Sequence, residues 1–234
     1  MVALLAMLGA LAVAGCSRQT NEQTAGADTL RNGVPRALEP RLAGWTRIWR
    51  HAVPRFRLDS LRRFPSETFH FDYAWRDTAH ELDPVRAHAL IDVRSPDSSH
   101  SLDFDVYLDF ERNESGKIVL GREPDSAPVL ADLKSDSLWR VAFCGTPCFF
   151  DGAYWADDRR FALTGATRTG AGSNGPWAAF LDVYDLRTRT VTRWLASPVD
   201  DHAFDRYRSA SDAALIERLE DAGVRKTSES AAMY

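Results

Sequence analysis

The chain has 234 residues, of which 44% are hydrophobic; this is enough to bury one core and excludes a chain that is disordered throughout. Its 7 Trp, 6 Tyr and 12 Phe are plentiful for a domain of this size and favour sheets over helices. The net charge of −4 argues against general nucleic-acid binding, because phosphate neutralisation needs a concentrated cationic surface.

The first feature along the chain is an apolar run that starts at Leu4 and ends in Val13-Ala14-Gly15-Cys16. It is too short to span about 30 Å of hydrocarbon, but it has the length of a signal-peptide core. Its last four residues resemble the lipobox of bacterial lipoprotein signal peptides, where cleavage follows small residues and the cysteine thiol receives a diacylglyceryl group. The resemblance implies a signal peptide over 1–15, cleavage before Cys16, and acylation of that cysteine.

Ser17 follows the cysteine where lipoproteins retained in the inner membrane often carry Asp. This favours a lipid anchor in the outer membrane, facing the periplasm. The basic residue that usually precedes the apolar run is missing between Met1 and Ala3, which predicts a true start upstream of Met1. The alternative interpretation is a hydrophobic N-terminal helix packed on the domain, with Cys16 as a buried thiol.

Residues 16–41 are predicted to form a lipidated, flexible tether ahead of a β-rich domain over 42–200. From Ser17 to about Gly33 there is hardly an apolar side chain, so burial cannot offset the entropy lost on ordering. The helical spacing of apolar residues then predicts a short helix between Leu42 and His51.

The segment from Arg31 to Arg63 is strongly basic, with nine Arg, no Lys and two acidic residues, a local balance of +7. Arginine beside Trp45 and Trp49 could hold anionic headgroups, lipopolysaccharide phosphates or glycan chains through ion pairing and stacking. We favour the simpler interpretation, in which the aromatic side chains pack on the sheet and the arginines stay in water or pair with acidic residues.

The clearest predicted strand runs from Ser101 to Phe110, because apolar residues occupy every second position without a break. One of its faces should belong to the core and the other should be wet. Similar alternation and turn signals predict further strands at Phe69 to Trp75, Ala87 to Val93, Pro128 to Leu133, Leu138 to Phe143, Arg160 to Gly165, Trp177 to Tyr184 and Val191 to Leu195.

A weak internal repeat relates residues 131–141 to residues 184–194. Each copy is an apolar strand, an Asp-Leu-basic-polar-polar turn and a second strand, and an Asp-containing turn and strand precede each copy. The pattern resembles the blades of periplasmic β-propellers over about 87 to 195. Only two units are visible, whereas a closed propeller needs four or more. We therefore predict a mainly β fold of antiparallel meanders, with two or three blade-like units forming an open sheet stack or a sandwich.

Residues 201–234 are predicted to form a C-terminal helix and tail. Ser209 and Asp212 match a capping box, an apolar stripe follows, and Gly223 stands where a helix would stop. The predicted helix covers about 209 to 222.

Cys144 and Cys148 remain once Cys16 carries lipid, and an oxidising compartment favours a disulfide between them. Two alternatives stay open: a redox-active pair, which usually has two intervening residues, and a metal site, for which no nearby His completes the ligand set.

Two acidic clusters suggest calcium, because carboxylate oxygens are its preferred ligands. One cluster lies on the Ser101 to Phe110 strand (Asp103, Asp105, Asp109), and the other flanks a turn (Asp151, Asp157, Asp158). Side chains two apart on a strand stand nearly 7 Å from one another, which is too far for them to share one ion unless the chain curves. We therefore favour solvated carboxylates and predict no metal.

No nucleophile elbow, zinc-protease helix, phosphate-binding loop or dinucleotide fingerprint is present in the sequence. We expect a non-enzymatic binding or scaffold module of the cell envelope, without a cofactor, whose partner is the membrane through Cys16 and an envelope protein or polymer. The alternative is an envelope glycan or peptidoglycan hydrolase that uses an acidic pair. The candidate ligand-facing residues are Trp139, Trp155 and Trp177.

Overall fold

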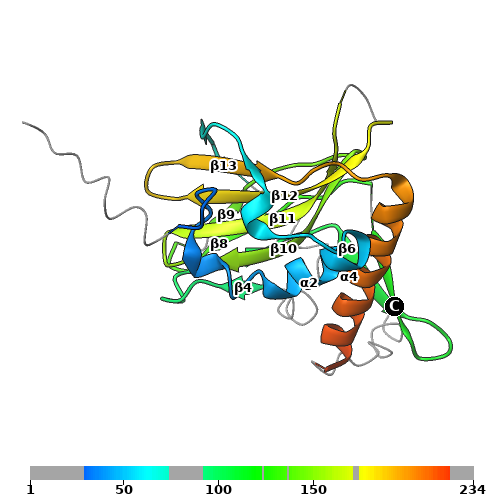
Figure 1. Ribbon diagram of the computed structural model, residues 1–234. Helices are drawn as coiled ribbons and strands as arrows, with labels where there is room; N and C mark the ends of the chain where they lie inside the picture. Colours follow the sequence, from blue (N-terminus) through cyan, green and yellow to red (C-terminus); the bar gives the residue numbers. More distant parts are fainter. Residues whose placement is uncertain (1–28, 74–91, 123, 136, 171–173, 222–234) are drawn as a thin grey trace, which may run out of the picture.

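The computed structural model describes residues 29–73, 92–122, 124–135, 137–170 and 174–221 (Figure 1). The predictions for the signal peptide, for Cys16 and for the tail after residue 221 lie outside these ranges. In chain order the elements are the 3-10 helix η1 (Arg36–Leu38), helix α2 (Ala43–Ala52), the 3-10 helix η2 (Leu58–Ser60), strands β1 (Arg62–Arg63), β2 (Glu67–Thr68), β3 (Asp72–Tyr73), β4 (Val93–Arg94), β5 (His100–Asp103), β6 (Leu108–Arg112), β7 (Ile118–Arg122), β8 (Val129–Asp132), β9 (Ser137–Arg140), β10 (Cys148–Trp155), β11 (Arg160–Arg168), β12 (Trp177–Asp185) and β13 (Thr190–Leu195), and helix α4 (Asp201–Asp221).

The fold is mainly β, with two antiparallel sheets and a C-terminal helix, as the sequence predicts. The large sheet has the order β1-β13-β12-β11-β10, with β2 also paired to β13, and strands β10 to β13 form a continuous meander. The small sheet has the order β3-β9-β8-β5-β4, and β6 pairs with β7 in a separate hairpin. The described residues form an open stack of sheets and no closed barrel.

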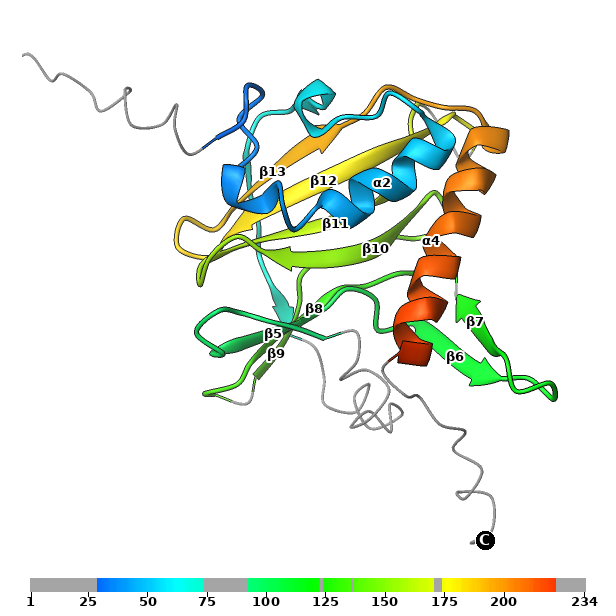
Figure 2. The same ribbon diagram turned by 60° about the horizontal axis from the view of Figure 1, so that its bottom comes forward.

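The large sheet is buried on both faces, which explains why β12 is apolar at nearly every position. Its outer face packs under α2, with Leu181 and Val183 in the same cluster as Trp45 and Trp49. Its inner face packs against the small sheet. Figure 2 shows the resulting layers, with α2 lying over the large sheet and β5, β8 and β9 beyond its other face.

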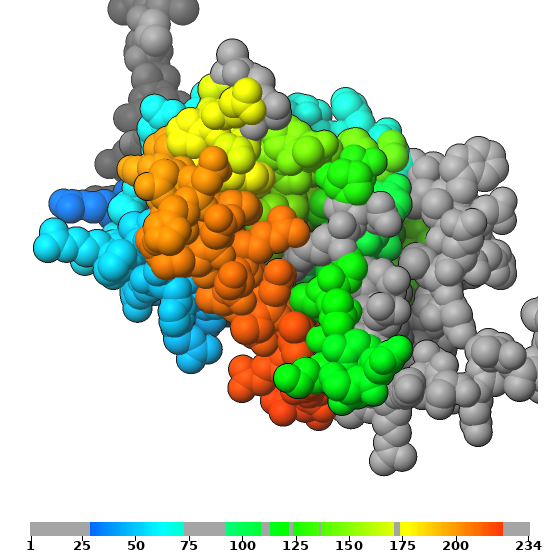
Figure 3. All heavy atoms as spheres, turned by 90° about the vertical axis from the view of Figure 1, so that its right-hand side faces the viewer, coloured from blue at the N-terminus to red at the C-terminus, as the bar shows by residue number. Residues whose placement is uncertain are grey.

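Helix α4 joins the two layers along one side of the molecule. Its buried residues recur at a helical spacing, and its first half packs with α2 through Tyr207, whose ring stacks on Trp49 with the centroids 3.8 Å apart. Its second half places Leu215 and Leu219 in the core between the sheets. Figure 3 shows this side, where the β6–β7 hairpin lies beside α4.

Five predicted strands are confirmed as β8, β9, β11, β12 and β13, with ends that differ by a few residues. Of the upstream strand predicted from Phe69 to Trp75, the described part contains β3, and residues 74–91 lie outside the described ranges, with most of the strand predicted from Ala87 to Val93. Strand β10 was not predicted. The turns of the internal repeat are confirmed in detail: Asp132 Oδ1 accepts the backbone N–H groups of residues 134 and 135, and Asp185 Oδ1 accepts those of residues 187 and 188.

The prediction of one unbroken strand from Ser101 to Phe110 is wrong, because the chain turns between β5 and β6. Asp103 Oδ1 accepts the N–H of Asp105 at 2.9 Å, and the carbonyl of Asp105 accepts the N–H of Leu108 at 3.2 Å. Short carboxylate side chains that bond to backbone N–H groups nearby favour turns over strands. The alternating pattern is therefore shared between two strands of different sheets.

Two boundaries also need correction. The predicted tether over 16–41 is too long, since Val34 and Leu38 have no exposed surface and belong to the core. Helix α4 starts eight residues before Ser209, because Asp200 caps it by accepting the N–H of Ala203 at 2.7 Å. The proposed capping box at Ser209 lies inside the helix.

Candidate functional site

A cavity of about 720 Å³ lies at the end of the stack where the hairpin turns of the two sheets meet. The large sheet contributes its β10–β11 and β12–β13 turns, the small sheet contributes β5, β8 and β9, and the segment after β2 supplies one wall. We call it the inter-sheet cavity. Because the repeated Asp turns set the ends of these hairpins, they also determine which side chains reach the cavity.

The first group of lining residues is aromatic: Phe69, Phe71 and Trp139. The ring centroids of Phe69 and Phe71 lie 4.8 Å apart, and those of Phe71 and Trp139 lie 6.3 Å apart. Phe69 is anchored at its other side by Tyr184, at 5.2 Å. Trp139 is half-buried, so part of its ring area remains available to a ligand. These three rings form the aromatic wall of the cavity.

The second group is cationic: Arg159, Arg187 and Arg189, all exposed. Arg159 and Arg187 follow the turn carboxylates Asp157 and Asp185, which accept their backbone N–H groups at 2.9 and 2.8 Å. The guanidinium groups of Arg159 and Arg187 have no hydrogen-bond or ion-pair partner in the described part of the chain. These three residues form the cationic rim.

Arg189 connects the rim to the wall. Its guanidinium carbon lies 4.9 Å from the centroid of the Phe71 ring, and its carbonyl accepts the N–H of Phe69 at 3.0 Å. Its backbone has φ +56, in the left-handed region. A cation over an aromatic face is attracted by the ring quadrupole, so this contact holds both side chains at the cavity.

The third group is two carboxylates, Asp132 and Asp158, with His70 and His100 beside them. The Ser135 hydroxyl and the backbone N–H groups after Asp132 hold the pKa of that carboxyl below its usual value. Asp158 Oδ1 accepts the N–H of Asp97 at 2.9 Å. Both carboxylates thus accept hydrogen bonds from backbone N–H groups, and they add negative charge beside the rim.

The three tryptophans predicted to face a ligand do not share a cleft. Trp139 lines the inter-sheet cavity. Trp155 has no exposed surface, and its Nε1 donates to the carbonyl of Val93 at 2.8 Å. Trp177 is buried on the outer face of the large sheet, with its ring stacked on Phe204 at 3.9 Å. The prediction is therefore wrong for Trp155 and Trp177, which are core residues.

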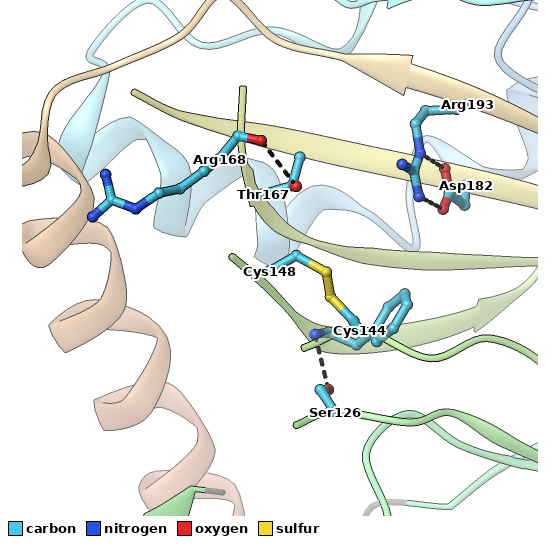
Figure 4. Close-up of a disulfide and its surroundings, with 8 residues drawn as sticks. Ser126, Cys144, Cys148, Thr167, Arg168, Asp182 and Arg193 are labelled. Carbon is cyan, nitrogen blue, oxygen red and sulfur yellow. Dashed lines mark hydrogen bonds and ion pairs between the residues drawn. A yellow bond between two sulfur atoms is a disulfide. The ribbon is translucent and has the colours of Figure 1, made fainter. Parts of the chain in front are cut away.

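Cys144 and Cys148 lie at disulfide distance, as predicted, with their Cα atoms 5.6 Å apart (Figure 4). The pair precedes and begins β10 and is tied to the neighbouring segment by reciprocal backbone bonds between Cys144 and Ser126. Neither cysteine lines the inter-sheet cavity. The cysteine pair therefore lies at the start of β10 and outside the candidate site.

The acidic residues are not gathered into a group of three potential metal ligands within the described ranges. The prediction of a solvated face is wrong for Asp103 and Asp105, which are buried and serve the turn after β5. Asp151 accepts the Thr164 hydroxyl at 2.6 Å. Sequence reasoning also missed an ion pair between the buried Asp182 and the half-exposed Arg193, cross-strand partners on β12 and β13.

The cationic rim was missed as well, although the repeat contained its signal. Basic residues follow the turn Asp in each copy, and a hairpin turn projects such residues from the end of a sheet.

Among the described residues, no helix is long and apolar enough to cross a membrane. Comparisons with protein families, curated proteins and solved structures found no match, so the functional proposal relies on the site's own chemistry.

Proposed function

We propose that this protein is a non-enzymatic binding module of the cell envelope, anchored through lipid on Cys16. In this proposal the inter-sheet cavity receives a segment of an envelope polymer or of a protein partner. The lipobox supports the location, and a disulfide-distance cysteine pair fits an oxidising compartment. The observation that carries the binding role is the cavity, which combines an aromatic wall with a cationic rim.

The chemistry of the cavity favours a ligand that carries a carboxylate or phosphate next to a ring or an apolar group. Arginine pairs with such anions through two parallel hydrogen bonds. The planar faces of Trp139 and Phe71 suit a sugar ring or an apolar side chain. A volume of about 720 Å³ has the size of sites that hold one small ligand or a short polymer segment.

The alternative, a glycan or peptidoglycan hydrolase, would use Asp132 and Asp158 as its acidic pair, because both line the cavity. A general acid needs a raised pKa to hold its proton near neutral pH. The pKa of Asp132 is instead lowered, because the Ser135 hydroxyl and backbone N–H groups stabilise its carboxylate, so Asp132 does not fit the role of the general acid. The aromatic wall and the cationic rim, which an acidic pair does not need, favour binding over hydrolysis.

The test is recovery of a partner from chemically crosslinked envelopes, with the intact protein and two variants of equal charge change. R159Q/R187Q removes two cations from the rim, whereas R41Q/R47Q removes two exposed cations far from it on α2 and the segment before it. We expect the same partner with the intact protein and with R41Q/R47Q, and several-fold less with R159Q/R187Q. Failure to recover a consistent partner, or equal recovery with both variants, would contradict the proposal.

A further inference from the structure

The nine arginines between Arg31 and Arg63 are all exposed in the structure. They lie on η1, α2, β1 and the connecting segments, and we call this set the arginine face. Its opposing charges are Glu39 and Asp59, and Asp59 forms an ion pair with Arg57 at 2.6 Å. The face thus keeps a large positive excess within a chain whose net charge is −4.

Helix α2 shows how the fold directs this charge outward. Trp45, Trp49 and Ala52 are buried against the large sheet, whereas Arg47 and Arg50 lie on the exposed side of the helix. The aromatic residues are therefore used in the core, and only the arginines remain for a partner. Figure 2 shows α2 lying over the large sheet, and the small sheet packs on the other face.

The neighbouring helix α4 carries both negative and positive charges in the half that packs beside α2, among them the exposed Asp201, Asp205 and Arg206. Helix α4 packs beside α2, and a shallow hollow between them contains His51, Asp205 and Arg206. Arg206 also donates to the carbonyl of Ala52 at 3.3 Å, which brings a further cation to the end of α2. The arginines at positions 41, 47 and 55 have no hydrogen-bond or ion-pair partner among the residues that the structure describes.

We infer that the arginine face docks on the surface of a bilayer that contains anionic phospholipid. Guanidinium groups bind phosphate through paired hydrogen bonds, and each basic residue near an anionic bilayer contributes about 1 kcal/mol. The inference rests on the proposed function only in that lipid on Cys16 would hold the face near a membrane. Cys16 precedes Thr29 by thirteen positions, and such a segment spans at most about 45 Å.

This orientation has a consequence for the inter-sheet cavity. The arginine face covers the outer side of the large sheet, whereas the cavity is bounded by the small sheet on the inner side. Docking through α2 therefore leaves the cavity, which lies at the end of the stack, uncovered by the bilayer. A ligand in the aqueous envelope then reaches Trp139 and the cationic rim without competition from lipid headgroups.

The experiment is vesicle co-sedimentation of the full chain carrying C16S, so that no lipid is attached. Vesicles contain phosphatidylcholine alone, or phosphatidylcholine and phosphatidylglycerol in equal parts. The neutral vesicles measure any partition of the apolar run near the N-terminus, and the difference between the two compositions measures charge. R41Q/R47Q/R55Q is compared with R159Q/R187Q/R189Q, which removes three cations from the cavity rim.

We expect binding to the anionic vesicles that weakens with salt, because exposed charges are screened within about 8 Å at physiological ionic strength. Each lost arginine should reduce the binding constant about fivefold, so R41Q/R47Q/R55Q should lose about a hundredfold and R159Q/R187Q/R189Q little. R47Q alone, expected to lose about fivefold, tests the same point with one surface change. Equal binding to both vesicle types, or equal loss in the two triple variants, would overturn the inference. Loss of partner recovery with R159Q/R187Q alone would bear on the cavity and leave this result unchanged.

Discussion

Leu38→Ala is the sharpest test of where the folded domain begins. Leu38 lies on η1, in the segment that the sequence assigns to a tether, yet it has no exposed surface and packs in the cluster beneath α2. Removing a fully buried leucine side chain from a core typically costs about 2–5 kcal/mol, because apolar contacts are lost and a cavity remains. We expect a loss of about 3 kcal/mol in the free energy of unfolding.

Urea unfolding followed by tryptophan fluorescence measures this loss. With a slope of about 2–3 kcal/mol per molar urea, the midpoint should fall by about 1 M. The matched control is Arg41→Ala, three residues along the chain and exposed, which should change stability by no more than about 0.5 kcal/mol. If Leu38→Ala and Arg41→Ala had equally small effects, residues 36–41 would not belong to the fold, and the account of the arginine face would lose its base.

Three further predictions concern Asp97, the Cys144–Cys148 pair and the Asp182–Arg193 ion pair. The hydroxyl and backbone N–H of Ser99 and the Ser95 hydroxyl lower the pKa of Asp97 from 3.8 to about 2. Its folded pKa lies below its unfolded one, so its stabilisation is present above pH 3.8 and lost as the pH falls toward about 2. Acid unfolding of D97N should depend less on pH there; an unchanged pH profile would refute this. C144A/C148A should lose about 2 kcal/mol in the free energy of unfolding, the chain-entropy value for a five-residue loop. Reductant should have no further effect on this variant. A stability equal to that of the oxidised parent would count against a disulfide. Arg193→Met leaves the Asp182 carboxylate buried without its partner. It should cost about 2 kcal/mol in the free energy of unfolding, less than for a fully buried pair because half of Arg193 is exposed. In thermal unfolding D182N/R193M should recover part of this loss, and no recovery would mean that the two residues act independently.

Strand pairing was predictable from the sequence where alternation coincided with turn chemistry. In the β12–β13 hairpin, apolar residues flank the Asp185 turn, and local hydrogen bonding alone determines where the chain reverses. The same alternation failed at Asp103 and Asp105, because a period of two does not show whether a carboxylate points to water or bonds to the backbone. Strand β10 was missed because Asp151 and Gly152 interrupt its apolar residues and the register shifts at this point, so no period of two appears.

The candidate site was only partly predictable. Trp139 lines the inter-sheet cavity, whereas Trp155 and Trp177, which look the same in the sequence, are buried in the two core clusters. The arginines of the rim come from separate hairpins of the large sheet and are brought together by the pairing of β11 with β12, a long-range contact that the local sequence does not show. The helical spacing at Trp45 and Trp49, by contrast, was local information and predicted α2 almost to the residue.

Site-specific photocrosslinking in intact envelopes tests the central claim most directly. A photoreactive residue replaces Trp139, which lines the inter-sheet cavity, or Leu133, which is 44% exposed on the neighbouring β8–β9 turn and does not line it. If the cavity is the binding site, position 139 should give a discrete crosslinked product that R159Q/R187Q diminishes, and position 133 should give much less. Equal products at the two positions, or a product only at 133, would contradict the account.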